Sequence, residues 1–465
     1  MNKRRDENKP IVWTIAGSDS GGGAGIQADL HTFQDFAVHG CSVITAVTAQ
    51  NSKALQHSEY INNNSVSAQI EALATDLPAD VIKLGMLADT QTVQLVINYL
   101  DQYSGFVVCD PVMVASRGGA LLSEEGVSLV RDRLLPRIDL LTPNVPEAQS
   151  LTGLTITSAQ DVINAAKRLI ELGARSVLIT GGHWHAVDGC RLDYWTDGEQ
   201  GFWLAGADIK SEHSHGSGCT LSSAIAAMIA RGYVLADAMV VAKAYVTQGI
   251  RLGVRVGAGP GPVSHQGWPS HWQDFPLLSP QLPQAVPVFQ PCGGHLGLYP
   301  VVDSAEWIAK LIPLGVPTIQ LRIKDVSEAF ARQQISAAIT LCKKYKTRLF
   351  INDYWQLAIE LGAYGVHLGQ EDLENADLTA IAQAGLRLGL STHSYYEIAR
   401  AHAIRPSYIA IGPVYCTTTK VMKFSELGIA QLKTMGGFIN AALSLNRDWR
   451  YKRGSCTGCT LNRHW

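Results

Sequence analysis

The chain has 465 residues, 46% of them hydrophobic and 17% charged, with a formal net charge of −2 at pH 7. This length predicts about two or three domains, and the composition excludes a disordered chain. The nearly balanced charge argues against nucleic acid as a partner, and no apolar run reaches the ~18 residues of a membrane span. The polar N-terminus lacks the apolar core of a secretory signal, and nine cysteines without a disulfide framework favour a reducing, cytoplasmic setting.

A glycine-rich loop opens the first domain. The apolar run 11–15 predicts a strand, residues 15–25 carry the glycines, and residues 26–36 predict a helix. The loop is no Walker loop, because no Gly-Lys-Ser/Thr ends it, and its glycines are not spaced as a dinucleotide fingerprint. A nucleotide in this domain must therefore be held by another geometry.

Apolar segments then alternate with helical stretches up to about residue 270. The expected strands span residues 42–48, 81–85, 106–109, 139–141 and 176–180. Their continuous apolar character and the helices between them predict a parallel sheet covered on both faces. Polar residues follow several of these strands, at the edge where such sheets bind ligands. Each of them, Asn144 and Asp110 included, is also explained singly as a cap or a turn former.

A second glycine turn, His215-Gly216-Ser217-Gly218-Cys219-Thr220, precedes an amphipathic helix with Leu221 and Ile225 on its apolar face. Backbone N–H groups converge at such a helix end, which carries about half a positive charge and favours a phosphate or an oxyanion. Alone, this turn is equally well a simple connection. The glycine loop at residues 15–25 favours the anion-binding interpretation.

Residues 271–292 are rich in proline and lack periodicity, so they predict a linker. Short apolar runs that end in polar residues follow at 298–302, 318–322, 348–352, 365–368, 386–391 and 408–414. Polar chemistry at the carboxyl ends of successive parallel strands is typical of a β/α barrel, which needs eight strands. No strand–helix pair can be read in residues 438–465. The fold class expected for the whole chain is therefore α/β, an open parallel sheet followed by an incomplete TIM-type barrel.

Residues 10–270 resemble the hydroxymethylpyrimidine/phosphomethylpyrimidine kinases of thiamine synthesis, which have the ribokinase-like fold. The motifs that carry the resemblance are Ile15-Ala16-Gly17-Ser18-Asp19, Gly22-Gly23-Ala24-Gly25-Ile26-Gln27-Ala28-Asp29, Thr142-Pro143-Asn144-x-x-Glu147 and Gly216-Ser217-Gly218-Cys219-Thr220. The resemblance implies phosphorylation of hydroxymethylpyrimidine and of its monophosphate by ATP with Mg²⁺. The alternatives are a pyridoxal kinase, which has the same fold, and a kinase with a vestigial, non-catalytic barrel. A non-catalytic binder of vitamin precursors is the alternative from another class.

The resemblance also implies residue roles. Gln50 and the backbone around Gly17 and Ala24 would hold the pyrimidine. The nucleotide and its Mg²⁺ would be held by Asn144, Glu147, Thr180 and Gly182, with Asp110 and Glu147 on the metal side. Thr180 stands where some members carry a lysine, so a lysine contact to the nucleotide would be absent or replaced.

The anion hole is implied at the second glycine turn. The backbone amides of Gly216, Ser217, Gly218 and Cys219 would stabilise the charge of the transferred phosphoryl group. Cys219 stands where relatives that act on sugars have an aspartate base. A helix N-terminus lowers the pKa of a thiol, so we expect Cys219 to form a thiolate base; the alternative is a small residue that completes the loop.

The second domain, residues 293–446, resembles thiamine-phosphate synthase. The matching motifs include Gln320-Leu321-Arg322-Ile323-Lys324, Ile351-Asn352-Asp353, His367-Leu368-Gly369-Gln370-Glu371-Asp372 and residues 389–393 and 412–420. The resemblance implies that the pyrimidine diphosphate is held by Gln320, Arg322, Lys324 and Asn352, pyrophosphate by Ser391 and Lys420, the thiazole phosphate by Thr417 and Thr419, and Mg²⁺ by Asp353 and Asp372. Ionising a C–O bond to pyrophosphate needs cations and a metal on the departing oxygens. We expect small-molecule substrates, no membrane partner and a homo-oligomer.

The synthase family then expects a seventh strand that ends in a glycine loop resembling Ala-Ile-Gly-Gly-Ile-Ser, and an eighth strand. Here Arg447-Asp448-Trp449-Arg450-Tyr451-Lys452 stands instead. Read one nucleotide later, the possible codons of this segment permit Ala, Ile, Gly, Gly, Ile and Ser in turn. We therefore predict a frameshift near residues 442–447, genuine or introduced in sequencing, with an out-of-frame tail over 447–465. A barrel without strands seven and eight has an incomplete phosphate site, and weak or no synthase activity is expected.

Overall fold

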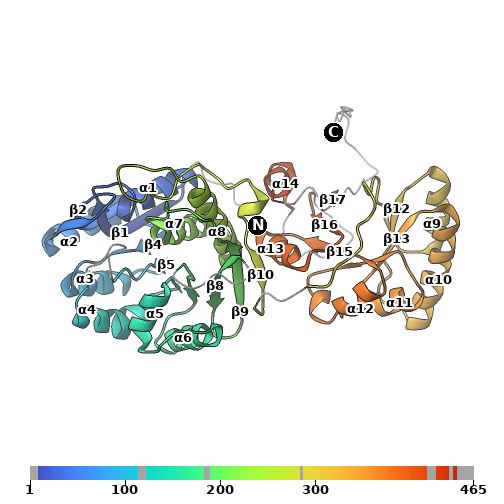
Figure 1. Ribbon diagram of the computed structural model, residues 1–465, viewed down its shortest axis with the longest axis horizontal. Helices are drawn as coiled ribbons and strands as arrows, with labels where there is room; N and C mark the ends of the chain where they lie inside the picture. Colours follow the sequence, from blue (N-terminus) through green and yellow to red (C-terminus); the bar gives the residue numbers. More distant parts are fainter. Residues whose placement is uncertain are drawn as a thin grey trace. The chain divides into compact units, whose positions relative to one another are not determined.

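The chain forms two compact units in the computed structural model, which describes residues 9–113, 122–182, 189–282, 286–415, 426–438 and, as backbone, 444–447 (Figure 1). The first unit comprises Met1–Val286 together with Ser394–Ala403, and the second comprises Pro287–His393 and Ile404–Trp465. Among the described residues, no helix combines the length and the apolar character that a membrane crossing requires.

A ten-stranded mixed sheet forms the centre of the first unit, in the order β10-β9-β8-β7-β6-β5-β4-β1-β2-β3. Its parallel strands are β1 (Ile11–Asp19), β2 (His39–Gln50), β4 (Val81–Leu84), β5 (Phe106–Cys109), β6 (Leu140–Leu141) and β7 (Val177–Ile179). The antiparallel strands are β3 (Leu55–Tyr60), β8 (Cys190–Thr196), β9 (Gly201–Ala207) and β10 (Leu277–Ser279). The predicted parallel sheet is confirmed at the centre and is wrong at both edges.

The edge strands explain where the sequence analysis failed. β8 and β9 form a hairpin whose strands are mostly buried, so they lack the polar alternation that marks a half-exposed strand. β10 lies inside the predicted linker, and Asp274 just before it forms an ion pair with Arg251, Nη2 to Oδ2 2.6 Å. Irregular structure was the wrong prediction for residues 272–279, because pairing to an open sheet edge needs no periodic side-chain pattern.

Helices cover both faces of this sheet. One face carries α3–α6, and the other carries α1, α7 and α8 (Figure 1). The helices of this unit are α1 (Gly25–Asp35), α2 (Asn63–Asp76), α3 (Thr90–Leu100), α4 (Glu124–Leu129), α5 (Val145–Thr152), α6 (Ala159–Glu171), α7 (Ser217–Ala230) and α8 (Leu235–Arg251), with the short turns η1 (Val130–Leu134), η2 (Leu135–Arg137) and η3 (Trp272–Asp274). The main core lies between the sheet and α2–α6 and includes Trp13, Ile15 and Ile82. α7 is buried along most of its length, so its N-terminus is held rigidly against the sheet.

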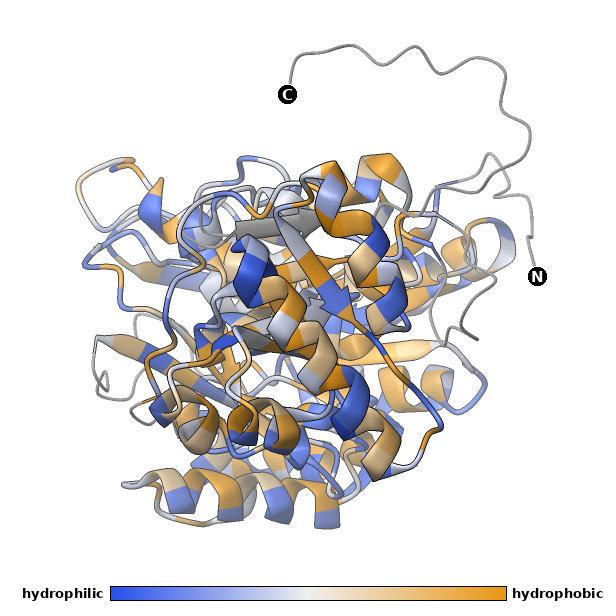
Figure 2. Ribbon diagram, turned by 90° about the vertical axis from the view of Figure 1, so that its right-hand side faces the viewer, coloured by the Kyte–Doolittle hydropathy of each residue, from blue (hydrophilic) through white to orange (hydrophobic). Residues whose placement is uncertain are grey.

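The second unit is a parallel sheet whose seven strands follow the chain order from β11 to β17. The strands are β11 (Val301–Val302), β12 (Thr318–Leu321), β13 (Arg348–Asn352), β14 (Gly365–Leu368), β15 (Arg387–Thr392), β16 (Tyr408–Ile411) and β17 (Ser444–Arg447). The helices that alternate with them along the chain are α9 (Ala305–Leu311), α10 (Glu328–Tyr345), α11 (Trp355–Glu360), α12 (Leu378–Gln383), α13 (Tyr395–Ile404) and α14 (Gly428–Gly436), with the turns η4 (Ile312–Leu314) and η5 (Asp372–Glu374). Of these, α13 is counted with the first unit, which includes Ser394–Ala403. Sequential parallel pairing is the topology of a TIM-type barrel. The helices in Figure 2 mix hydrophilic and hydrophobic segments, as helices with one covered face do.

The seventh strand corrects the prediction that the barrel lacks it. β17 pairs in parallel with β16, Tyr408 opposite Ser444 and Ile411 opposite Arg447. The backbone groups at the free edge of β16 are paired in this way without any side-chain pattern in the added strand, so no local pattern predicted it. Among the described residues there is no eighth strand.

Candidate active sites

The two glycine loops of the first unit meet in space. Gly216 is the N-cap of α7 with a φ of +80°, and a Cβ there would lie 1.9 Å from the Gly23 carbonyl oxygen. Gly25 has a φ of +57°, and a Cβ there would lie 2.3 Å from the carbonyl oxygen of Gly17. Both positions therefore require glycine, since a side chain at residue 216 would push the two loops apart and one at residue 25 would distort the first loop. The structure thus brings the predicted residues Gly17, Ala24 and Gly216 together.

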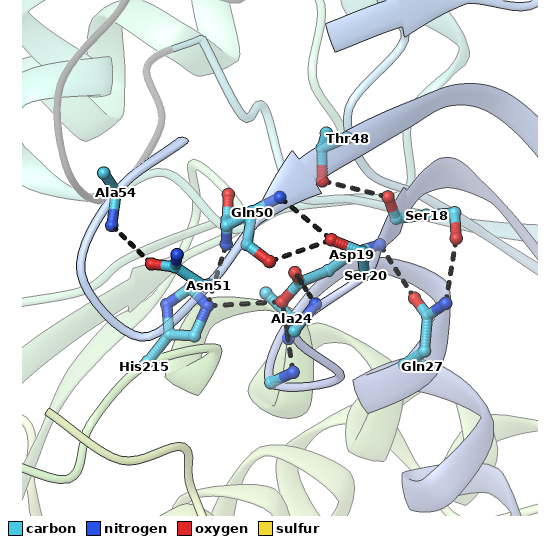
Figure 3. A network of polar contacts seen from close by, with 12 residues as sticks. Ser18, Asp19, Ser20, Ala24, Gln27, Thr48, Gln50, Asn51, Ala54 and His215 are labelled. Atoms are coloured by element: carbon cyan, nitrogen blue, oxygen red, sulfur yellow. Dashed lines mark hydrogen bonds and ion pairs between the residues drawn. The ribbon is translucent and has the colours of Figure 1, made fainter. Parts of the chain in front are cut away.

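Asp19 holds the first loop in shape. Its Oδ1 accepts a hydrogen bond from the amide of Gly21 at 2.8 Å, and its Oδ2 accepts from the amides of Gly23 at 3.1 Å and Ala24 at 2.9 Å (Figure 3). Burial alone would raise the pKa of Asp19, but the hydrogen bonds from His215 and from the loop amides lower it. The carboxylate is therefore ionised at neutral pH and acts as the anchor of the loop.

Gln50 joins the first loop to the second. Its Nε2 lies 3.1 Å from Nε2 of His215, which in turn lies 3.4 Å from Oδ2 of Asp19 (Figure 3). The hydroxyl of Ser20 donates to the carbonyl oxygen of Gln50 at 2.8 Å, which fixes the end of β2 on the loop. The residue expected to hold the pyrimidine is thus one contact away from the anion-hole turn. No role was predicted for Asp19 and His215, although Asp19 lies inside a motif that carries the family resemblance and His215 opens the second glycine turn.

The first turn of α7 faces Asp110 at the end of β5. A Cβ on Gly218 would lie 3.4 Å from Oδ2 of Asp110. The Cys219 thiol donates a hydrogen bond to Asp110 and accepts one from the amide of Gly25. The amides of Gly218 and Cys219 belong to the first helical turn, which has no internal acceptor. The amide of Ser217 donates to the Ser214 carbonyl at 3.2 Å, so the expectation that it faces the ligand is corrected for this residue.

The expected thiolate at Cys219 is also corrected. Burial is the largest effect on this thiol and, together with the charges of Asp110 and Asp29, it raises the pKa of Cys219 to about 12. The charge of Lys83 and the amide of Gly25 act in the opposite direction and do not prevail. A helix N-terminus lowers a thiol pKa only where burial and carboxylates do not outweigh it.

A protonated Cys219 has a measurable consequence. At pH 8 we expect iodoacetamide to modify Cys219 at least about 100-fold more slowly than a free thiol of pKa ~8.5, because only the thiolate reacts. The rate is followed by mass spectrometry of the peptide that contains residue 219, with glutathione as the reference thiol. Alkylation at the rate of the reference would contradict the protonated state.

The residues expected on the metal side form a compact group. Asn144 and Glu147 make a capping box at the start of α5, each side chain accepting from the other's backbone N–H at 2.9 Å. Burial, followed by the charge of Asp110, raises the pKa of Glu147 to about 8, and burial raises that of Asp110 to about 6. Thr180 forms a backbone bridge to Asn144.

This arrangement fits a magnesium ion held jointly with a nucleotide. Among the described residues there is no group of three metal-ligating side chains. Mg²⁺ commonly uses only one or two carboxylates and takes its remaining ligands from phosphates and water. Both acids have pKa values raised by burial, and a bound cation stabilises the ionised forms of such buried acids. Gly182 follows β7. Its carbonyl oxygen accepts a hydrogen bond from Nη1 of Arg191 at 3.2 Å.

The second unit places two acids together at the ends of neighbouring strands. Asp353 follows β13 with a φ of +63°, which few residues other than glycine adopt, and it forms an ion pair with Lys324. Asp372 accepts from the amide of Gly369 at 2.8 Å and makes a hydrogen bond with Asp353. Burial and the charge of Asp353 raise the pKa of Asp372. The pair predicted to bind Mg²⁺ is therefore brought together.

Further expected residues of the synthase site line the same strand ends. Asn352 has a buried Nδ2 with no hydrogen-bond partner among the described residues, so this amide is available to a ligand. Gln320 donates from Nε2 to the hydroxyl of Tyr299 at 3.4 Å, and Arg322 is close enough to His367 to lower its pKa. Thr417, Thr419 and Lys420 lie outside the described residues.

A buried chain of polar side chains, which the sequence analysis missed, supports this site. Ser391 Oγ lies 2.8 Å from Nε2 of His367, whose Nδ1 lies 2.7 Å from the hydroxyl of Tyr408. The hydroxyl of Tyr408 lies 2.7 Å from that of Tyr299, the partner of Gln320. Two expected ligand residues, Ser391 and Gln320, are thus linked through the core. The only available signal was a polar His367 within an apolar run.

His367 makes the stability of the second unit depend on pH. Burial lowers the pKa of His367 to about 4, whereas the unfolded value is ~6.5. Between these values the unfolded chain binds the proton and the folded chain does not, so stability falls as the pH falls. We expect His367 to cost about 2 kcal/mol at pH 5 relative to pH 7.

The variant His367→Asn removes this titration. We therefore expect the stability difference between the wild-type protein and His367→Asn to shrink by the same amount between pH 7 and pH 5. Proteolysis of the second unit along a urea series measures both proteins. A difference that does not change with pH would refute the assignment.

The mixed sheet, the two joined glycine loops and the N-terminus of α7 at their junction define a ribokinase-like small-molecule kinase, followed by a parallel β/α domain. A family model described as phosphomethylpyrimidine kinase matches residues 19–264, and one described as thiamine monophosphate synthase matches residues 298–442. The chain belongs to the phosphomethylpyrimidine kinase family and carries a second domain of the thiamine monophosphate synthase family.

Individual relatives agree with this assignment. The chloroplastic thiamine biosynthetic bifunctional enzyme of Arabidopsis thaliana is 34% identical over 88% of this chain and 80% of its own. The hydroxymethylpyrimidine/phosphomethylpyrimidine kinase of Synechococcus elongatus is 44% identical over 55% of this chain and 97% of its own. Among solved structures, an ADP complex of Bacillus subtilis pyridoxal kinase matches 56% of this chain and 98% of its own, with 34% identity and a TM-score of 0.52.

Proposed function

We propose that the first unit transfers a phosphoryl group from ATP to the hydroxymethyl group of 4-amino-5-hydroxymethyl-2-methylpyrimidine and then to its monophosphate. The observation that carries this proposal is the junction of the two glycine loops. It places Gln50 and His215, 3.1 Å apart, beside the turn that leads into the first turn of α7. A substrate bound at Gln50 therefore presents its hydroxyl to a helix N-terminus suited to phosphoryl charge.

The residues of this unit have distinct tasks in the proposal. Gln50, held by Ser20, orients the pyrimidine, and Asp19 keeps the first loop closed on it. The amides of Gly218 and Cys219 stabilise the charge of the transferred group. The substrate hydroxyl can pass its proton to the Cys219 sulfur while the thiol's own proton moves to Asp110, whose carboxylate accepts the thiol hydrogen bond.

Asp110 and Glu147 are proposed to hold Mg²⁺, and Asn144, Thr180 and Gly182 to contact the nucleotide. The ion, when bound, neutralises charge on the phosphates. Support comes from the raised pKa values of the two acids and from their place at the strand ends. We also propose domain boundaries at residues 270 and 293 and a homo-oligomeric state. A reducing compartment such as the cytoplasm is proposed because every described cysteine is a free thiol.

The test is turnover of the purified full chain with ATP and hydroxymethylpyrimidine, followed as ADP release and as appearance of the diphosphate. Pyridoxal-type phosphorylation is the second candidate, favoured by the likeness to the Bacillus subtilis pyridoxal kinase. A higher kcat/KM for pyridoxal than for hydroxymethylpyrimidine would favour that candidate. Binding of both substrates without turnover would contradict a kinase.

The second unit is proposed to join the pyrimidine diphosphate to thiazole phosphate with release of pyrophosphate. Asp353 and Asp372 would hold Mg²⁺, and Lys324, Asn352 and Ser391 would contact the phosphates and the pyrimidine. We propose that the residues from 447 on are out of frame and impair this activity. A synthase assay of this exact chain, beside one restored to the alternative frame, tests the impairment: equal turnover contradicts it, as does DNA whose other frame encodes no family-like segment.

A further inference from the structure

A fully buried ion pair lies beneath the kinase site. Lys83 on β4 and Asp29 on α1 both have side chains without solvent exposure, and Nζ of Lys83 lies 2.9 Å from each carboxylate oxygen of Asp29. Asp29 also accepts from the hydroxyl of Thr14 at 2.6 Å and from that of Ser223 at 2.7 Å. The carboxylate thus receives hydrogen bonds from β1, β4 and α7.

This pair is placed next to the reacting end of the site. A Cβ on Gly85, which follows β4, would lie 3.0 Å from Nζ of Lys83, so the ammonium is at the carboxyl end of that strand. Ser223 lies four residues after Cys219, which is one helical turn. The hydroxyl of Thr220, in the same turn, is buried with no hydrogen-bond partner among the described residues. Asp29 therefore connects Lys83 to α7 one helical turn beyond the proposed anion hole.

A contribution to the free energy of folding is a weak explanation for a buried Lys83–Asp29 ion pair. Desolvation of two buried charges commonly cancels their attraction, and apolar replacements are often neutral or stabilising. The neighbours of Lys83 on its strand, Ile82 and Leu84, are apolar and fully buried. Lys83 also lies near enough to Cys219 and Asp110 for its charge to act on both of these groups.

We propose that Lys83, held by Asp29, is a positioning residue of the phosphoryl transfer. The ammonium supplies a fixed positive charge behind the first turn of α7, and Asp29 transmits its position to that turn through Ser223. A charge fixed in a water-free region stabilises developing negative charge without reorganisation. This inference rests on the proposed kinase function.

The variant Lys83→Met/Asp29→Asn tests the inference, because it removes both charges and leaves no buried ion without its partner. We expect an unfolding midpoint close to that of the wild-type protein, KM values for pyrimidine and ATP within about 3-fold, and a kcat at least about 30-fold lower. A kcat within about 3-fold of the wild-type value in the folded double variant would overturn the proposal. If the wild-type protein itself shows no turnover, the proposed function fails instead.

Two further variants keep the result interpretable. Arg251→Met/Asp274→Asn removes another ion pair of the first unit, whose carboxylate is 1% exposed, and should leave kcat unchanged. Ser223→Ala keeps the Lys83 pair and removes only its hydrogen bond to α7, and it should lower kcat by about 3- to 10-fold at an unchanged unfolding midpoint. A wild-type kcat in Ser223→Ala would overturn the transmission through α7, even if the double variant does not fold.

Discussion

Gly216→Ala is expected to lower the kcat/KM of the kinase by at least about 100-fold. The added Cβ would lie 1.9 Å from the Gly23 carbonyl oxygen, so the two glycine loops must move apart. A displacement of about 1 Å at reacting groups commonly costs about 100-fold in rate. The positive φ of +80° adds strain, and the clash and strain together should lower the free energy of unfolding by about 2–4 kcal/mol. Turnover with hydroxymethylpyrimidine and urea unfolding measure both effects.

Gly232→Ala is the matched control. Gly232 follows α7 with a φ of +85°, and nothing lies within 4 Å of a Cβ there. It therefore carries the same backbone strain without a clash, and we expect a lower stability with unchanged kcat/KM. Equal activity losses in the two variants would show that backbone strain at the two ends of α7, and not the junction of the loops, controls the reaction.

Asp110→Asn is expected to separate activity from stability. The kcat of the kinase should fall at least about 100-fold, since Asp110 is the proposed proton acceptor beside the Cys219 thiol and, with Glu147, a proposed ligand of Mg²⁺. Burial raises the pKa of Asp110, so the folded chain binds the proton more readily than the unfolded chain, and the ionised form is destabilising near neutral pH. The amide should therefore leave stability unchanged or increase it at pH 7.

Asp89→Asn serves as the control for this substitution. Asp89 caps α3 through its side chain, which accepts from the amide of Thr92, and asparagine caps a helix equally well. We expect wild-type turnover and stability. A kcat of Asp110→Asn within about 3-fold of the wild-type value, or a loss of stability that accounts for the lost activity, would contradict the role given to Asp110.

Local sequence patterns predicted many of the helices and strands of the first unit. The expected helix 26–36 is α1, shifted by one residue, and the expected strands of residues 11–15 and 106–109 are present in β1 and β5. The added antiparallel strands β3, β8, β9 and β10 were not predicted, because strand pairing at a sheet edge depends on which backbone is nearby. β17 was missed for the same reason.

The sequence also predicted which residue types lie at the candidate sites, but it did not predict their protonation states. Cys219 at the start of a helix suggested a thiolate, but its pKa depends on Asp110, Asp29 and Lys83, which come from β5, α1 and β4. The local sequence indicates only the lowering of the thiol pKa by the helix N-terminus. Desolvation and charges from distant segments act in the opposite direction and are larger.

Glycines and apolar periods, which act over a few neighbouring positions, were enough to establish the α/β class and to mark Gly216 as a candidate site residue, and the family resemblance added Gln50. Their meeting through His215, the burial of Lys83 with Asp29 and the protonated state of Cys219 were decided only by the folded chain. Hydrogen bonds, close approach and desolvation depend on distance in space, and residues 29 and 223, for example, are 194 positions apart in the chain and meet only in the folded protein.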